Sequence, residues 1–300
     1  MPDDRGVPMM PPVNRREFLA AVPAAAFARR APKPVVAAHV WVYAAPLPQY
    51  DVYPILDRIF ADMKWAGIEA IELMHNALLH ADSVERVREA SGKHGLPVIG
   101  SSFEGKMWDR SAHSAIADAA ETLAERLQQL GGRTLGTSVG DPGPRRKTPA
   151  ELDAQGEMVA KLSAICARRK IVLNLHNHTY EVRDGEYDLK GTLARVPGVK
   201  LGPDLDWLAG AGVDPAGFIR RYAGRIVYAH LRDRKADGVW SEAMGEGAID
   251  YKAIARAFRD VNFRGDVAIE LAHPADFTPT RPLRESLRIS REFVRKTLGW

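Results

Sequence analysis

Cysteine and long apolar runs are both scarce in this chain of 300 residues. Its single cysteine, Cys166, cannot form an internal disulfide, and one thiol cannot build a thiolate metal cluster. No apolar run approaches the roughly 20 residues that cross a bilayer, so we expect no membrane insertion of the mature chain. With 46% hydrophobic and 27% charged residues, the composition is that of a packed globular protein.

Excess positive charge is nearly absent from the body of the chain. The formal net charge is +4, but residues 1–33 carry most of it, because they hold six Lys/Arg against three acids. A nucleic-acid-binding protein is expected to carry a basic stripe on its folded part. We therefore expect no nucleic-acid partner.

The N-terminal segment has the pattern of a twin-arginine export signal. Residues 14–19 read Asn-Arg-Arg-Glu-Phe-Leu, and the small apolar run 20–28 that follows ends in an Ala-Phe-Ala cleavage site. The alternative is a disordered basic tail. We expect residues 1–33 to be a leader that is removed or disordered, residues 34–300 to be the folded domain, and the protein to be periplasmic or extracellular.

Past the leader, eight short β-branched runs alternate with longer helical patterns. Such runs, bounded by Gly or Pro, are typical of buried parallel strands. The predicted strands cover residues 35–43, 70–74, 97–102, 133–138, 171–176, 199–204, 226–231 and 266–271. The predicted helices cover residues 51–65, 83–94, 115–130, 148–169, 189–195, 214–222, 250–260 and 283–298.

This alternation predicts an α/β fold. Eight parallel strands joined by right-handed crossovers close into a barrel, so we predict a single-domain (β/α)8 TIM barrel. An open, doubly wound sheet is the alternative. The glycine-rich loops that cradle phosphates in such sheets are missing, since neither Gly-x-Gly-x-x-Gly after the first strand nor Gly-x-x-x-x-Gly-Lys-Ser/Thr occurs.

The last four predicted strands each deliver a metal-type residue at the carboxyl end. These residues are His176, Asp204, His230 and Glu270. The four ends are neighbours on one rim of a barrel, so two imidazoles and two carboxylates converge in a set that suits Mn²⁺, Zn²⁺, Co²⁺ or Fe²⁺. Singly, each histidine is more simply a hydrogen-bonded core residue and each acid a helix cap. Together the four predict one divalent metal ion, for which we favour manganese.

Five segments carry a resemblance to a known family. They are residues 176–181, 204–215, 225–233, 245–247 and 265–270. In this order and spacing they resemble the xylose isomerase-like TIM barrels, often labelled sugar phosphate isomerase/epimerase, which include D-tagatose 3-epimerase-like and inosose dehydratase-like enzymes. The family typically holds a divalent metal with Glu, Asp, His and Glu from these strand ends. The resemblance therefore implies metal-ligand roles for Asp204, His230 and Glu270.

The sequence departs from the family at two positions. His176 stands where many relatives have the first Glu, which in the epimerase branches both binds metal and moves a proton. Its replacement removes one of two carboxylates that would act on opposite faces of a carbon, which argues against a symmetrical two-base epimerase. Trp207 stands where sugar epimerases place a substrate-binding His, and its indole offers a stacking surface for a pyranose ring.

Further residues near the strand ends are candidates for catalysis and substrate binding. Glu270 and His178 are the candidate catalytic residues, although His178 could instead orient a ligand. Glu181 either orients a histidine, binds a substrate hydroxyl or is solvated in a loop. Arg232 either contacts a substrate oxygen or forms an ordinary ion pair, and Glu72 either binds a hydroxyl or lies in the core. Other candidate hydroxyl binders or cavity walls, with core, rim or packing roles as the alternatives, are His39, His75, Glu104, Trp41, Phe103, Trp108 and Trp240.

These features predict metal-assisted chemistry beside a sugar carbonyl. A divalent ion that chelates a carbonyl and the neighbouring hydroxyl stabilises the enediolate formed by proton removal. Return of the proton gives isomerisation or epimerisation, and loss of a β-oxygen gives elimination. We expect an isomerase/epimerase-like enzyme for an unphosphorylated sugar or keto-sugar. The alternatives are a metal-dependent lyase or dehydratase acting on keto-sugars or 3-keto-glycosides, and a non-catalytic periplasmic sugar-binding protein. The sugar and the oligomeric state are left open.

Overall fold

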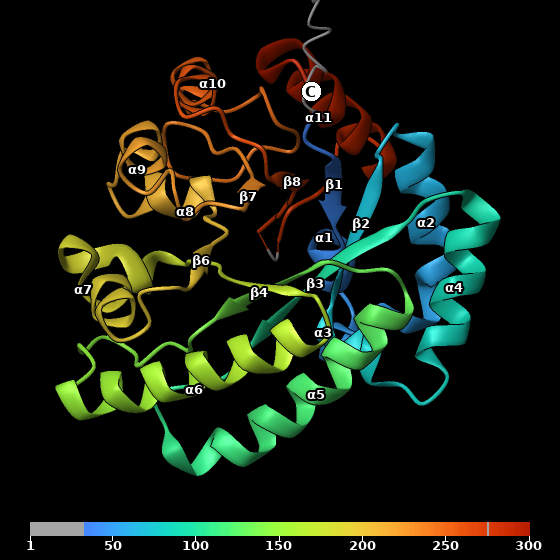
Figure 1. Ribbon diagram of the computed structural model, residues 1–300. Coiled ribbons are helices and arrows are strands. Elements are labelled where there is room, and N and C mark those ends of the chain that lie inside the picture. Colours follow the sequence, from blue (N-terminus) through green and yellow to red (C-terminus); the bar gives the residue numbers. More distant parts are fainter. Residues whose placement is uncertain (1–32, 275) are drawn as a thin grey trace, which may run out of the picture. The chain divides into compact units, whose positions relative to one another are not determined.

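Eight parallel strands lie at the centre of the fold, surrounded by helices (Figure 1). The computed structural model describes residues 33–274 and 276–300, so the expected leader lies, apart from Lys33, outside the described residues. The strands are hydrogen-bonded in the order β6-β5-β4-β3-β2-β1-β8-β7. They are β1 (Val36–His39), β2 (Ala70–Met74), β3 (Val98–Glu104), β4 (Thr134–Ser138), β5 (Val172–Leu175), β6 (Lys200–Leu201), β7 (Tyr228–Leu231) and β8 (Asp266–Ile269).

The sheet closes on itself between β6 and β7. Two isolated parallel bridges join these strands, Leu201 with Ile226 and Asp204 with His230. We call residues 201–204 and 226–230 the β6–β7 seam. Strand β6 is short because Pro203 has no N–H to donate to a ladder and because helix α8 begins directly after Asp204. The predicted single-domain TIM barrel is confirmed.

Eight long or medium helices follow the predicted pattern. They are α2 (Leu56–Trp65), α4 (Ser83–His94), α5 (His113–Gln129), α6 (Pro149–Arg168), α7 (Thr179–Arg195), α9 (Pro215–Arg221), α10 (Tyr251–Asp260) and α11 (Leu283–Leu298). Short helices α1 (Trp41–Ala44), α3 (His75–Leu79) and α8 (Leu205–Gly210) were not predicted. Within the described ranges, none of the helices combines the length and apolarity needed to span a bilayer.

Two predicted boundaries near the site are wrong. The first strand ends at His39 and not at residue 43, because Trp41 N donates to His39 Nδ1 at 3.1 Å and turns the chain into α1. Helix α7 begins at Thr179 and not at residue 189. Its start is stabilised by the Glu181 carboxylate, which accepts a 2.7 Å hydrogen bond from His178 N. The helical conformation is interrupted at residues 183–186.

A small cluster of buried residues fills part of the barrel interior. It consists of Ala37, Ala70, Ile99, Tyr228 and Ala268. Three of these positions are alanine, and their small side chains leave room for the Tyr228 ring. Tyr228 Oη donates a 3.0 Å hydrogen bond to Glu72, which is fully buried. A buried carboxylate therefore lies in the barrel interior, between this cluster and the candidate site.

Candidate active site

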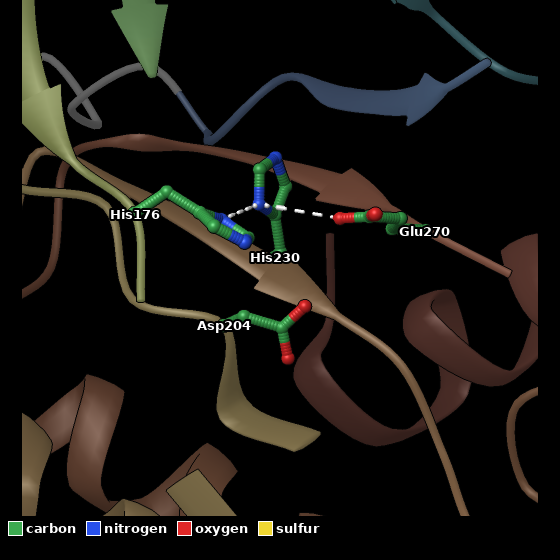
Figure 2. Close-up of side chains that lie close together, drawn as sticks. All are labelled: His176, Asp204, His230 and Glu270. Carbon is green, nitrogen blue, oxygen red and sulfur yellow. Dashed lines mark hydrogen bonds and ion pairs between the residues drawn. The ribbon is translucent and has the colours of Figure 1, made fainter. Parts of the chain in front are cut away.

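The four predicted metal ligands converge at the carboxyl ends of β5 to β8. His176 follows β5, Asp204 caps α8, His230 lies in β7, and Glu270 directly follows β8. One ligand atom from each lies within 4.8 Å of all the others. Figure 2 shows His176 and Glu270 on either side of His230, with Asp204 facing them. The structure thus brings the predicted set together.

Backbone hydrogen bonds between neighbouring strands set the positions of these residues. His176 N donates to Thr137 O at 3.0 Å, and His230 N donates to Pro203 O at 2.9 Å. Asn177, which points to the opposite face from the two histidines beside it, accepts a 3.2 Å hydrogen bond from Asp204 N. The end of β5 is therefore tied to the residue that begins α8.

In each of the two carboxylates one oxygen has short partners, and the other has only a longer ion-pair contact, Asp204 Oδ2 with Arg232 at 3.4 Å and Glu270 Oε2 with His230 at 3.4 Å. Asp204 Oδ1 accepts from the N–H groups of Asp206 and Trp207 at 2.9 and 3.0 Å, as a helix cap. Glu270 Oε1 forms a 2.6 Å ion pair with Arg232. Within the described part of the chain, Asp204 Oδ2 and Glu270 Oε2 are buried without a hydrogen-bond partner. Buried orphan oxygens are costly, so the donor set fits a divalent cation.

The imidazole of His230 is oriented by a carboxylate behind it. Its Nε2 lies 2.6 Å from Glu72 Oε2, and its Nδ1 lies 2.6 Å from His176 Nδ1 and 3.4 Å from Glu270 Oε2. Because an ionised carboxylate only accepts, Nε2 carries the proton and Nδ1 faces the site. Two bare lone pairs at 2.6 Å would repel each other, so a proton or a cation belongs on this side of the ring.

The charges around the site favour the same conclusion. Burial raises the pKa of Asp204, and the nearby Glu270 carboxylate adds to the rise against the influence of Arg232. Burial acts likewise on Glu270, but Arg232 and the surrounding imidazoles outweigh it and hold its pKa low. Burial lowers the pKa of His230, yet Glu72 and Glu270 reverse this and raise it to about 9. Positive charge is therefore stabilised on His230, whereas burial and the neighbouring imidazoles lower the pKa of His176.

An inner cavity of about 300 Å³ is lined by three of the four candidate ligands, His176, His230 and Glu270. Its aromatic walls include Trp41, Tyr50, Phe103, Trp207 and Trp240. Trp207 and Trp240 pack edge to face at 5.6 Å, and the Arg232 guanidinium lies 5.5 and 5.3 Å from their ring centres. Among the described polar groups, Arg232 Nε is buried without a hydrogen-bond partner. The cavity thus combines aromatic faces with an available donor, as sugar-sized pockets do.

The structure places the remaining predicted residues at different depths. His178 lines the inner cavity, with its Nδ1 3.3 Å from Ser138 Oγ, and burial lowers its pKa to about 4. Glu181 is not solvated in a loop, because it is buried in the first turn of α7 and bonded to His178 N. Arg232 both lines the cavity and pairs with Glu270. His39, His75 and Glu104 also line it.

For Glu72 and Trp108 the structure favours the core or packing alternative over a role at the cavity. Glu72 does not line the inner cavity, and both of its contacts are with residues of β7. It is therefore placed to orient His230 and not to bind a hydroxyl at the mouth. Trp108 is not a cavity wall, since its Nε1 donates to Gly140 O at 3.0 Å and its ring packs under Arg145.

Several residues of the cavity were not predicted. Tyr50, Met74, Ser102 and Ser138 line it. Tyr50 belongs to a short turn, whose position depends on packing and not on any periodicity. The two serines follow a detectable signal, because Ser102 and Ser138 lie at or near the carboxyl ends of predicted strands, where barrel sites are built.

Comparisons with known proteins agree with the fold. Residues 60–296 match the family described as xylose isomerase-like TIM barrel. A sugar phosphate isomerase/epimerase from Parabacteroides distasonis is 15% identical, with a TM-score of 0.68 over 91% of this chain and 98% of that one. A 3-keto-D-glucoside 4-epimerase from E. coli is 16% identical, with a TM-score of 0.69 over 88% and 100%. A D-allulose 3-epimerase from Methylomonas sp. in complex with D-allulose is 16% identical, with a TM-score of 0.70 over 89% and 98%. No curated protein sequence matches the chain.

Proposed function

Because the chain belongs to the family of xylose isomerase-like TIM barrels, we propose that it is a divalent-metal-dependent isomerase/epimerase-like enzyme for an unphosphorylated sugar or keto-sugar. One observation carries the proposal. Two imidazoles and two carboxylates converge, each carboxylate has one buried oxygen without a hydrogen-bond partner among the described residues, and three of the four side chains line an aromatic-walled cavity. The names of the similar structures, which include epimerases of keto-sugars, support the reaction class.

His176, Asp204, His230 and Glu270 would hold the ion, for which manganese is favoured and zinc, cobalt or iron are alternatives. When bound there, it would supply Lewis-acid stabilisation of negative charge on a substrate carbonyl oxygen. Arg232, which lines the cavity, adds a fixed positive charge beside Glu270. These residues lower the energy of the enediolate that forms when a proton is removed beside the carbonyl.

Two groups are placed to move that proton. Glu270 is one of them, through the carboxylate oxygen that does not hold the ion. His178 is neutral at physiological pH because burial lowers its pKa to about 4, so its imidazole has a lone pair with which to accept a proton. His178 and Trp207 lie side by side, with ring centres 5.5 Å apart. A sugar ring stacked on the indole would therefore present its carbons to His178.

The charge of the inner cavity supports a substrate without a phosphate group. Among the described residues lining the inner cavity, Arg232 is the sole Lys or Arg, and it is already paired with Glu270. A phosphoryl group carries close to two negative charges and is usually met by several cations or a helix N-terminus. The twin-arginine pattern supports our further proposal that the protein works outside the cytoplasm, where unphosphorylated sugars are the available substrates.

The test is a metal-loading and exchange experiment. The purified protein is stripped with a chelator, reloaded with Mn²⁺, Zn²⁺, Co²⁺ or Fe²⁺, and incubated with a panel of keto-sugars in deuterated water. We expect close to one ion per chain and deuterium incorporation beside the carbonyl with at least one sugar. Product analysis then separates isomerisation, epimerisation and elimination. Loading without exchange on any keto-sugar or keto-glycoside would reject the enzyme proposal in favour of a sugar-binding protein.

A further inference from the structure

A second hollow, which we call the outer groove, continues from the inner cavity. His75, Glu104, His178 and Trp207 line both spaces. The outer groove has a volume of about 730 Å³, against about 300 Å³ for the inner cavity. Its other walls come from the loops after β3, β4 and β5, and include Lys106, Gly140, Asp141, Thr179, Tyr180 and Arg183. The ligand-lined floor therefore occupies only the smaller part of a longer binding surface.

An aromatic surface runs from one space into the other. The His178 ring stacks nearly parallel on Tyr180, with centres 5.5 Å apart and planes inclined by 16°. His178 also lies 5.5 Å from the Trp207 indole. Tyr180 lines the outer groove but not the inner cavity, whereas His178 and Trp207 line both spaces. The Trp207 indole, which lines both spaces, can therefore stack on a pyranose, and the stacked His178 and Tyr180 rings add an aromatic wall beside it.

The polar rim of the outer groove carries both signs of charge. Lys106 and Arg183 offer N–H donors, and Glu104 and Asp141 offer carboxylate acceptors. A site for a phosphate or a sulfate would need more positively than negatively charged side chains. A site for an apolar group would not need charged side chains at its rim. Balanced donors and acceptors around an aromatic face are complementary to a neutral polyhydroxyl compound.

We propose that the outer groove binds a second sugar ring, so that the substrate is a disaccharide or another glycoside and not a free monosaccharide. The inference rests on the proposed function for the identity of the ring that reacts, which lies in the inner cavity. Small-molecule sites occupy about 300 to 1,000 Å³. The inner cavity alone is at the lower end of this range, and the outer groove supplies the space that a second ring needs.

Equilibrium binding tests the groove without requiring turnover. The metal-loaded protein is titrated calorimetrically with hexose disaccharides and with their component hexoses. We expect at least one disaccharide to bind about tenfold more tightly than either component, a factor that stacking and rim hydrogen bonds of one ring can supply. Tyr180→Ala and Lys106→Ala should reduce this preference to within about twofold, with the affinity for the hexose unchanged.

Tyr50→Ala is the matched control, because Tyr50 lines only the inner cavity. It should weaken hexose and disaccharide by the same factor and leave the preference intact. If Tyr180→Ala does not fold, Lys106→Ala decides alone, since Lys106 is exposed. The proposal is overturned if no disaccharide is preferred over its hexoses, or if the groove variants weaken both ligands equally.

The two proposals fail in distinguishable ways. Deuterium exchange on free ketohexoses that is unaffected by Tyr180→Ala and Lys106→Ala, without any preference for disaccharides, leaves the enzymatic function standing and rejects the groove. A disaccharide preference that these variants abolish, in a protein that exchanges deuterium with no keto-sugar or keto-glycoside, supports the groove and rejects the function.

Discussion

Glu72 Oε2 lies 2.6 Å from Nε2 of His230, on the opposite side of the imidazole from the nitrogen that faces His176 and Glu270. A carboxylate in this position selects the tautomer of a histidine and raises its basicity as a ligand. Glu72 is fully buried, so this interaction is little screened by solvent. The relationship makes Glu72 a positioning residue for the candidate metal centre.

We predict that Glu72→Ala lowers the metal affinity of the protein by about ten- to hundredfold, with a smaller loss for Glu72→Gln, which keeps an acceptor. The measurement is competition for the ion against a calibrated chelator, with folding checked by circular dichroism. Tyr228→Phe removes the other hydrogen bond to the same oxygen and serves as the control, for which little change is expected. Unaltered affinity in both folded Glu72 variants would show that His230 needs no such support.

Asp204→Ala and His230→Ala should each lose bound metal while the barrel stays folded, because the ion adds to a core that the strands already make. Elemental analysis and circular dichroism give the two readouts. Asp204 also caps α8, so Asp214→Ala is a matched control. Asp214 caps α9 with both carboxylate oxygens and is absent from the candidate ligand set. Each lost cap costs about 1 kcal/mol, but only the Asp204 variant should lose metal. Full occupancy in either site variant would remove that residue from the set.

The histidine that replaces the family's carboxylate yields a third prediction. His176→Glu should still bind a divalent ion, because a carboxylate reaches a similar position, but the added negative charge lowers the Lewis acidity of the site. The new carboxylate also provides a possible second base. We expect native turnover to fall and deuterium exchange beside the carbonyl of a keto-sugar to rise. Normal occupancy and normal activity in both His176→Glu and His176→Ala would show that His176 is not a ligand.

Cys166 should be unreactive in the folded protein. Its side chain is fully buried in α6, and burial raises the pKa of its thiol to about 12. Since the thiolate is the nucleophile, a thiol-specific chromogenic reagent should label native protein negligibly and label one thiol per chain in denaturant. Rapid stoichiometric labelling without denaturant would contradict the packing of this helix.

The strand ends could be predicted from the sequence because their signal is local. Strand β2 has the predicted bounds, and the four ligands each stand at or just beyond an apolar run, where parallel strands place their site residues. Hydrophobic periodicity and the Gly and Pro residues that end an element are properties of neighbouring residues. They can therefore be read without knowledge of the tertiary structure.

Other parts of the site depend on contacts between distant residues or on unusual caps. The bond between Glu72 and His230 joins residues 158 positions apart, and nothing local distinguishes an inward carboxylate in β2 from a hydroxyl binder at its end. The start of α7 was missed because its cap is His178, which is not among the residues preferred there. Glu181 was therefore assigned to a loop.

The β6–β7 seam joins this chemistry to the mechanical integrity of the barrel. Its backbone pairing consists of two isolated bridges, and Asp204 and His230, one on each side, form one of them. A metal ion bound by both of those side chains would cross-link the two sides of the seam. The backbone amide protons in residues 201–204 and 226–230 would then exchange with solvent more slowly after metal loading. The rate of local opening at the seam would therefore report whether the protein carries its ion.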